Sequence, residues 1–82
     1  MISEAHAQAL LEGRDDAELV VVEGRAHVVS ADSLEREPYR GALRIVSRPD
    51  LAGPLGDIRS LSADTLAEVA GRLDATATRL GA

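Results

Sequence analysis

The sequence predicts an α+β fold, with a small, mainly antiparallel sheet of about three strands and helices packed on it. Three observations carry this prediction. Two β-branched runs flank a turn that contains glycine, a third strand-like run follows, and the last part of the chain repeats its apolar residues with a helical period. Since 82 residues supply only one core, we expect a single domain over residues 1–82.

The core of this domain has to be built from aliphatic side chains. Hydrophobic residues make up 45% of the chain, yet Tyr39 is its only aromatic residue. Without large rings each buried side chain contributes less apolar area, so we expect marginal stability or self-association. The chain has no cysteine, which excludes a disulfide scaffold and a thiolate metal site.

The first element is a short helix, predicted over residues 3–12. Ser3 can accept a hydrogen bond from a free amide at the helix start, Glu4 suits the positive end of the helix dipole, and Gly13 can end the helix. A helix of this length does not persist alone, so it must dock on the rest of the domain.

A β-hairpin follows, with strands over residues 18–23 and 26–30. The first strand is β-branched and apolar without interruption, which is typical of a strand covered on both faces. Gly24 can supply the tight turn between the two strands.

A third strand is predicted over residues 42–47. By simple alternation, Leu43 and Ile45 share one face, and the other face carries Arg44, Val46 and Arg48. Pro49 cannot donate to a sheet ladder, so the strand stops before it.

Two connecting segments flank this third strand. Residues 31–41 are polar and broken by Pro38, with room for one helical turn around Leu34. Residues 50–57 contain two glycines and a proline, which allow at most one helical turn, and residues 58–61 fit either an extended edge or a loop.

The last element is a long helix that begins after an N-cap at Ser62 and ends near Gly81. Its apolar stripe has helical spacing and comprises Leu66, Val69, Ala70, Leu73, Ala77 and Leu80. The simpler interpretation is that this stripe covers the domain's own sheet. Because its leucines recur every seven residues, the stripe also fits the seam of a homodimer.

Charge and hydropathy narrow the classes of function. The formal net charge of −5 disfavours general binding to nucleic acid, although a local basic stripe could still bind phosphate. The longest apolar run, residues 19–22, is far too short to cross a bilayer. The polar N-terminal residues lack the features of a signal peptide, so we expect a cytoplasmic protein that does not bind membranes.

No set of side chains forms a catalytic or metal-binding motif. His27 and Ser30 lie three apart on a predicted strand, so they point to opposite faces and cannot act as base and nucleophile. His6 and His27 come from different elements without the spacing of metal ligands. We therefore predict no catalytic residue, no metal and no cofactor.

The best candidate for a binding surface combines an aromatic ring with arginines, namely Tyr39, Arg40, Arg44 and Arg48. These side chains can cradle a phosphate or stack on a base. They can equally pair with neighbouring acidic residues or contact an acidic partner, and the acidic chain as a whole favours this second interpretation.

Three stretches resemble the MazF/PemK family of ribonuclease toxins. Residues 24–32 read Gly-Arg-Ala-His-Val-Val-Ser-Ala-Asp and resemble an early strand of that family, which reads Gly-Arg, then apolar residues, then Val-Ser-x-Asp. Residues 42–46 are similar to the next strand of that family, and residues 55–81 are similar to its closing segment and terminal helix. The resemblance implies a dimeric SH3-like barrel. It implies a catalytic role for Arg25, with Ser47 in place of the family's threonine, and His27 is then the only obvious titrating group.

The sequence thus supports two hypotheses. The first is a small, non-enzymatic and dimeric protein-interaction module, which contacts an unknown protein through its helix stripe or its arginine-bearing strand. The alternative is a toxin–antitoxin component, either a reduced ribonuclease that uses Arg25, His27 and Ser47 or a regulatory subunit whose acidic surface imitates nucleic acid.

Overall fold

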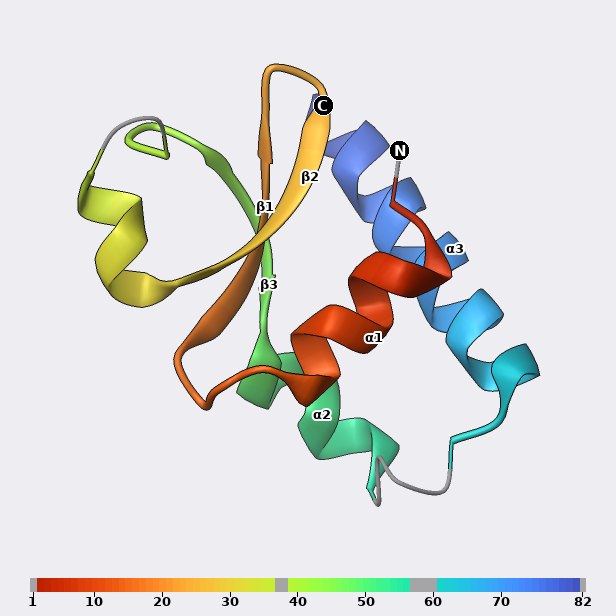
Figure 1. The fold of residues 1–82 in the computed structure, drawn as a ribbon. Coiled ribbons are helices and arrows are strands. Elements are labelled where there is room, and N and C mark those ends of the chain that lie inside the picture. Colours follow the sequence, from red (N-terminus) through yellow and green to blue (C-terminus); the bar gives the residue numbers. More distant parts are fainter. Residues whose placement is uncertain (1, 37–38, 57–60, 82) are drawn as a thin grey trace.

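The computed structural model describes residues 2–36, 39–56 and 61–81, and it confirms the predicted α+β architecture. Three antiparallel strands form one sheet, with a short helix before them and a long helix after them (Figure 1). In chain order the elements are α1 (Glu4–Glu12), β1 (Ala17–Val22), β2 (Arg25–Ser30), the 3₁₀ helix η1 (Ala31–Glu35), β3 (Leu43–Ser47), α2 (Arg48–Leu55) and α3 (Ala63–Arg79).

The sheet is centred on β1, which pairs with β2 on one side and β3 on the other. Residues 17–21 are all buried, which confirms a strand covered on both faces. The β1–β2 hairpin closes at the pair Val22–Arg25 through a two-residue turn. Both turn residues, Glu23 (φ 52°) and Gly24 (φ 77°), have positive φ, as a type I′ turn requires.

A bulge in β3 makes the predicted alternation along this strand wrong. Val46 lies opposite Leu19 and Arg44 lies opposite Val20, so Ile45 is an extra residue between two paired positions. The bulge moves Val46 to the same face as Leu19, away from Arg44. Arg48 does not extend the strand at all, because it is the first residue of α2.

The helix α2 is longer than the single turn predicted for residues 50–57. It runs over eight residues and starts at a Ser47 cap, whose Oγ accepts a hydrogen bond from the Asp50 amide at 3.3 Å. Pro49 sits in the first turn, where its missing N–H costs nothing. Leu51 and Leu55 pack against the core, which offsets the poor propensity of the segment. Of the segment predicted as an edge or a loop, residues 58–60 lie outside the described part of the chain.

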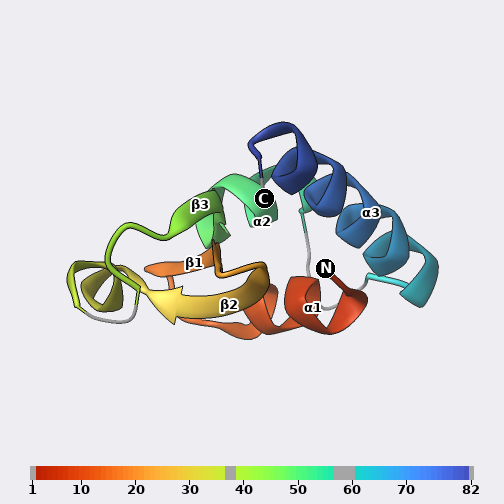
Figure 2. The ribbon, with the colours of Figure 1, turned by 90° about the horizontal axis from the view of Figure 1, so that it is seen from above.

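The core lies between the sheet and the helices α1 and α3, which lie side by side and contact each other (Figures 1 and 2). Its buried residues form one cluster that joins all three elements: Ile2, Ala7, Leu10, Ala17, Leu19, Val69, Leu73 and Ala77. α3 packs on α1 and on β3. One face of the sheet packs on this cluster, and we call the opposite face the outer face.

The stripe of α3 is used mainly inside the chain. Four of its residues are buried, namely Val69, Ala70, Leu73 and Ala77. Leu66 is half-buried against the core, and Leu80 is 51% exposed. The stripe therefore covers the domain's own core, with Leu80 alone among its large residues open to solvent. Ser62 caps the helix as predicted, because its Oγ accepts a hydrogen bond from the Thr65 amide at 3.2 Å.

A hydrogen bond ties the segment before α1 to α3. The Ile2 amide donates to Oδ1 of Asp74 at 3.0 Å, and this bond holds the pKa of the Asp74 carboxyl below its ordinary value of 3.8. A lowered folded-state pKa means that the ionised carboxylate stabilises the folded chain at pH values above 3.8. That contribution falls away as the pH drops through the lower, folded-state pKa.

We therefore expect the Asp74→Asn variant to unfold at lower urea concentration than the parent chain at pH 6, and the difference to shrink as the pH falls toward 3. Urea titrations followed by circular dichroism at several pH values measure both midpoints. A difference that stays constant with pH would contradict the assigned role of the Asp74 charge.

Candidate functional site

The outer face of the sheet carries the polar residues of interest. Glu18 and Val20 of β1 alternate with the core residue Leu19, so they belong to the outer face, together with their cross-strand neighbours His27 and Arg44. Val20 is fully buried there. Part of this face is therefore covered, and the covering residues belong to η1 and to residues 39–42, on the far side of the sheet from α1 and α3 (Figure 1). We call these two stretches the covering segment.

Tyr39 helps to hold that covering segment on the sheet. Its ring meets the His27 ring edge-on, with centroids 5.4 Å apart and planes inclined by 68°. This geometry places the positive ring edge of one aromatic against the face of the other, which is the favourable arrangement. Both side chains are half-buried. His27 therefore has a packing role on the outer face.

A hollow of about 510 Å³ opens between the covering segment and the sheet. We call it the Arg44 hollow, and its lining residues are Glu18, Ala31, Leu34, Glu35, Gly41, Ala42 and Arg44. Apolar groups from Leu34 and the two alanines line part of it, and one guanidinium and two carboxylates supply its charges.

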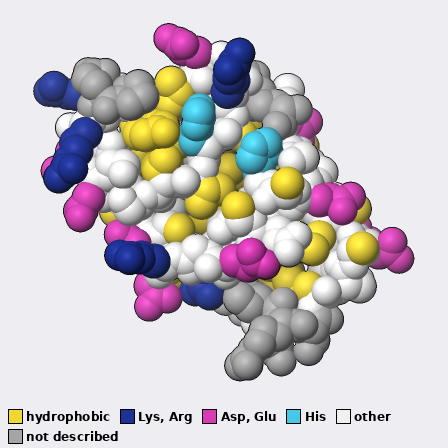
Figure 3. All heavy atoms as spheres, viewed as in Figure 1, with side chains coloured by type: hydrophobic (Ala, Val, Ile, Leu, Met, Phe, Trp, Pro, Cys, Tyr) yellow, Lys and Arg dark blue, Asp and Glu magenta, His cyan; other side chains and the backbone are white. Residues whose placement is uncertain are grey.

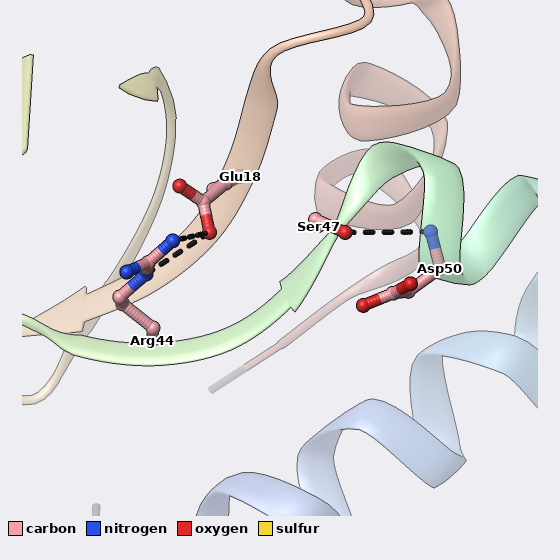
Figure 4. A network of polar contacts seen from close by, with 4 residues as sticks. All are labelled: Glu18, Arg44, Ser47 and Asp50. Atoms are coloured by element: carbon pink, nitrogen blue, oxygen red, sulfur yellow. Dashed lines mark hydrogen bonds and ion pairs between the residues drawn. The ribbon is translucent and has the colours of Figure 1, made fainter. Parts of the chain in front are cut away.

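An ion pair between neighbouring strands forms the polar end of this hollow (Figure 4). Nε and Nη2 of Arg44 both donate to Oε1 of Glu18, at 3.0 and 2.6 Å. The Glu18 side chain is only 9% exposed, whereas that of Arg44 is 64% exposed. The arginine thus compensates a buried carboxylate with its inner edge and keeps its outer edge in solvent.

The four predicted binding residues do not form one surface. Arg44 lines the hollow, Tyr39 packs on His27 at the outer face, and Arg40 is exposed one residue further along the chain. Arg48 is used elsewhere: its Nε donates to the Leu11 carbonyl at 3.0 Å and its Nη1 approaches Asp15 at 3.3 Å. Arg48 therefore links the end of α1 to the start of α2.

The alternative catalytic set of Arg25, His27 and Ser47 is not brought together. Arg25 lies opposite Val22 at the hairpin end of β1, and Ser47 lies opposite Glu18. These positions on β1 are four residues apart, or about 13 Å at roughly 3.3 Å per residue. The Ser47 hydroxyl serves as the α2 cap, and the His27 ring packs on Tyr39.

The described residues contain no group of three or more histidine, aspartate or glutamate side chains arranged to hold a metal ion. Histidine side chains reach the surface on the face seen in Figure 3. The nearest polar partner of His6 is Ser3, whose amide donates to Nδ1 of His6 at 3.0 Å. His6 therefore helps to cap α1.

Sequence reasoning missed Glu18, although it signalled Arg44. In the sequence, Glu18 is a single acidic residue at the start of an apolar strand. Without the bulge, simple alternation would place Glu18 and Arg44 on opposite faces of the sheet, so the pair does not follow from the sequence pattern. The predicted helical turn around Leu34 is confirmed as η1, and the structure places Leu34 and Glu35 in the wall of the hollow, a role that the sequence does not indicate.

No protein family, curated protein or solved structure matches this chain. Within the described ranges, no helix has the length and the apolar character that a membrane span needs.

Proposed function

We propose that this protein is a small, non-enzymatic interaction module, and that the Arg44 hollow binds a carboxylate-bearing segment of a partner protein. The observation that carries the proposal is the state of Arg44. Its guanidinium is fixed from one side by the buried Glu18 carboxylate, while 64% of the side chain is exposed. A guanidinium fixed in this way loses little conformational entropy when it binds a second carboxylate.

The rest of the hollow suits a peptide side chain. Its volume of about 510 Å³ lies within the range of small binding pockets. Leu34 and Ala42 offer apolar contact beside the Arg44 charge. An aspartate or glutamate next to an aliphatic residue would satisfy both parts of this lining.

Charge favours a protein partner over nucleic acid. Glu18 already compensates Arg44, and Glu35 adds a negative charge to the same wall. The chain as a whole carries −5. Each phosphate of a nucleic acid would be repelled by this excess negative charge, whereas a single carboxylate needs only to contact the outer edge of the Arg44 guanidinium.

The ribonuclease alternative has less support. It needs a general base and acid beside one phosphate, supplied by Arg25, His27 and Ser47, and these residues are spread along the sheet. Incubation with structured and unstructured RNA is expected to leave both intact. Cleavage that disappears in Arg25→Ala would overturn the proposed function in favour of a nuclease.

The direct test uses the capped peptide N-acetyl-Leu-Asp-Leu-amide and its Asn counterpart as probes in an amide NMR titration. We expect the Asp peptide to shift the amide signals of Glu35, Gly41 and Ala42, and to bind about tenfold more tightly than the Asn peptide, because a charged hydrogen bond is lost. Removing both charges with Glu18→Gln and Arg44→Gln should abolish this preference.

Arg40→Gln is the matched control, since Arg40 is exposed and does not line the hollow. This variant should keep the preference for the Asp peptide. Equal binding of both peptides to the parent chain, or signal shifts confined to other elements, would overturn the proposed site.

A further inference from the structure

The free edge of β2 offers backbone groups for another strand. In a type I′ hairpin the pair that flanks the turn is hydrogen-bonded, so Arg25, His27 and Val29 direct their N–H and C=O groups at β1. The alternate residues Ala26, Val28 and Ser30 therefore direct theirs outward. Among the described residues, none of these outward groups has a backbone hydrogen-bond partner.

The β2 strand itself carries none of the sequence features that protect an edge against pairing, and α1 contacts it from the side of the core. β2 runs for six residues in unbroken register, without a bulge, a proline or a lysine. The other edge strand, β3, is interrupted by its bulge at Ile45. In Figure 1 no ribbon passes in front of β2, and the same face in Figure 3 shows hydrophobic side chains between charged groups.

An exposed arginine lies at one end of β2, and an exposed aspartate lies beside the other end. Arg25 is exposed at the hairpin end. At the other end, the Ala31 amide donates to the Asp16 carbonyl at 3.0 Å, which places the exposed Asp16 beside the end of the strand. A groove of about 200 Å³ opens at that end, lined by Gly13, Arg14, Asp16, Ala17, Val28, Val29 and Ser30.

We propose that two copies of this chain pair antiparallel through their β2 edges, about a two-fold axis at Val28. Ala26 of each copy then lies opposite Ser30 of the other, and Val28 lies opposite its own equivalent. These three outward residues per copy form six backbone hydrogen bonds and one continuous six-stranded sheet. This dimer is independent of the Arg44 hollow, which lies on the outer face of the sheet.

The edge is self-complementary, which favours a second copy over a foreign strand. The groove end holds the exposed Asp16 and also the exposed Arg14. In this register Arg25 of each copy comes to the groove end of the other and pairs there with the Asp16 carboxylate, so the dimer has two equivalent ion pairs. His27 lies opposite Val29, and no like charges face each other within the paired strands. A foreign segment would need the same register and the same charge order to match.

Sedimentation equilibrium over a concentration series tests the dimer. The parent chain should reach twice its mass of 8.6 kDa. Arg25→Glu and Asp16→Arg should each weaken the dimer at least about tenfold, because each turns two attractions into repulsions. The double variant should restore most of the affinity. Arg40→Glu changes the net charge by the same amount as Arg25→Glu, at a residue outside β2 and its groove, and should leave the dimer intact.

Amide hydrogen exchange on the parent chain gives a second readout that needs no variant. The amides of Ala26, Val28 and Ser30 should exchange slowly in concentrated samples and faster on dilution, while those of His27 and Val29 stay protected throughout. A monomer at every concentration, fast exchange at Val28 in the concentrated sample, or a double variant no better than the single ones would each overturn the proposed interface.

Discussion

Replacing Leu10 by alanine is expected to lower the free energy of unfolding by about 3–5 kcal/mol. Leu10 is fully buried and belongs to the cluster that joins α1 to Leu19 of the sheet and Leu73 of α3. A domain of this size has a total stability of only about 4–12 kcal/mol, at roughly 0.05–0.15 kcal/mol per residue. The variant should therefore be partly or wholly unfolded at 37 °C.

Urea unfolding followed by circular dichroism measures this loss, since the chain has no tryptophan to report by fluorescence. Leu80→Ala removes the same atoms from a side chain that is 51% exposed, and it should cost less than about 1 kcal/mol. Similar costs for the two variants would contradict the position of the core.

Removing the Arg44 side chain is expected to cost about 2 kcal/mol, through the Arg44→Ala variant. The reason lies in Glu18 rather than in Arg44 itself. Glu18 stays buried after the substitution and loses both hydrogen bonds to its Oε1 atom. The exposure of Arg44 lets water replace part of the lost interaction, which keeps the cost below that of breaking a fully buried pair.

A double-mutant cycle separates this effect from a general loss of packing. In the Glu18→Leu background no buried carboxylate remains, so the further change Arg44→Ala should cost less than about 0.5 kcal/mol. Arg40→Ala, an exposed arginine on the same segment of chain, should also be nearly neutral. A cost at Arg44 that persists in the Glu18→Leu background would contradict the pairing.

The elements that the sequence predicts well are those decided by nearby residues. The hairpin depends on two β-branched runs and on Gly24 between them, and α3 depends on one apolar period and on a cap at Ser62. In both cases the residues that decide the structure lie close together in the sequence, and the tertiary packing agrees with their local preference.

The elements that escaped prediction are decided by distant contacts. Gly53 and Pro54 argue locally against α2, and the packing of the half-buried Leu51 and Leu55 against the core overrides them. The bulge at Ile45 follows from how β3 meets β1, which no local pattern reveals.

The candidate site follows the same rule. Glu18 and Arg44 are 26 residues apart in the chain, and only the sheet register brings them together. Tyr39, Arg40, Arg44 and Arg48 were grouped as one candidate surface because they are close in the sequence, but Arg48 is bound to the Leu11 carbonyl. Residues that are close in the sequence share a surface only when the elements that carry them face the same way, and this stretch spans several elements.

The position of α3 in the core delays the completion of folding while the chain is synthesised on the ribosome. The hairpin is complete at Ser30, yet the helix that closes the core over Leu10 and Leu19 ends only at Arg79, almost fifty residues later. At about 5–20 residues per second, the nascent hairpin waits several seconds with only α1 to cover its apolar face. During that interval we expect the nascent chain to bind chaperones that recognise exposed hydrophobic segments.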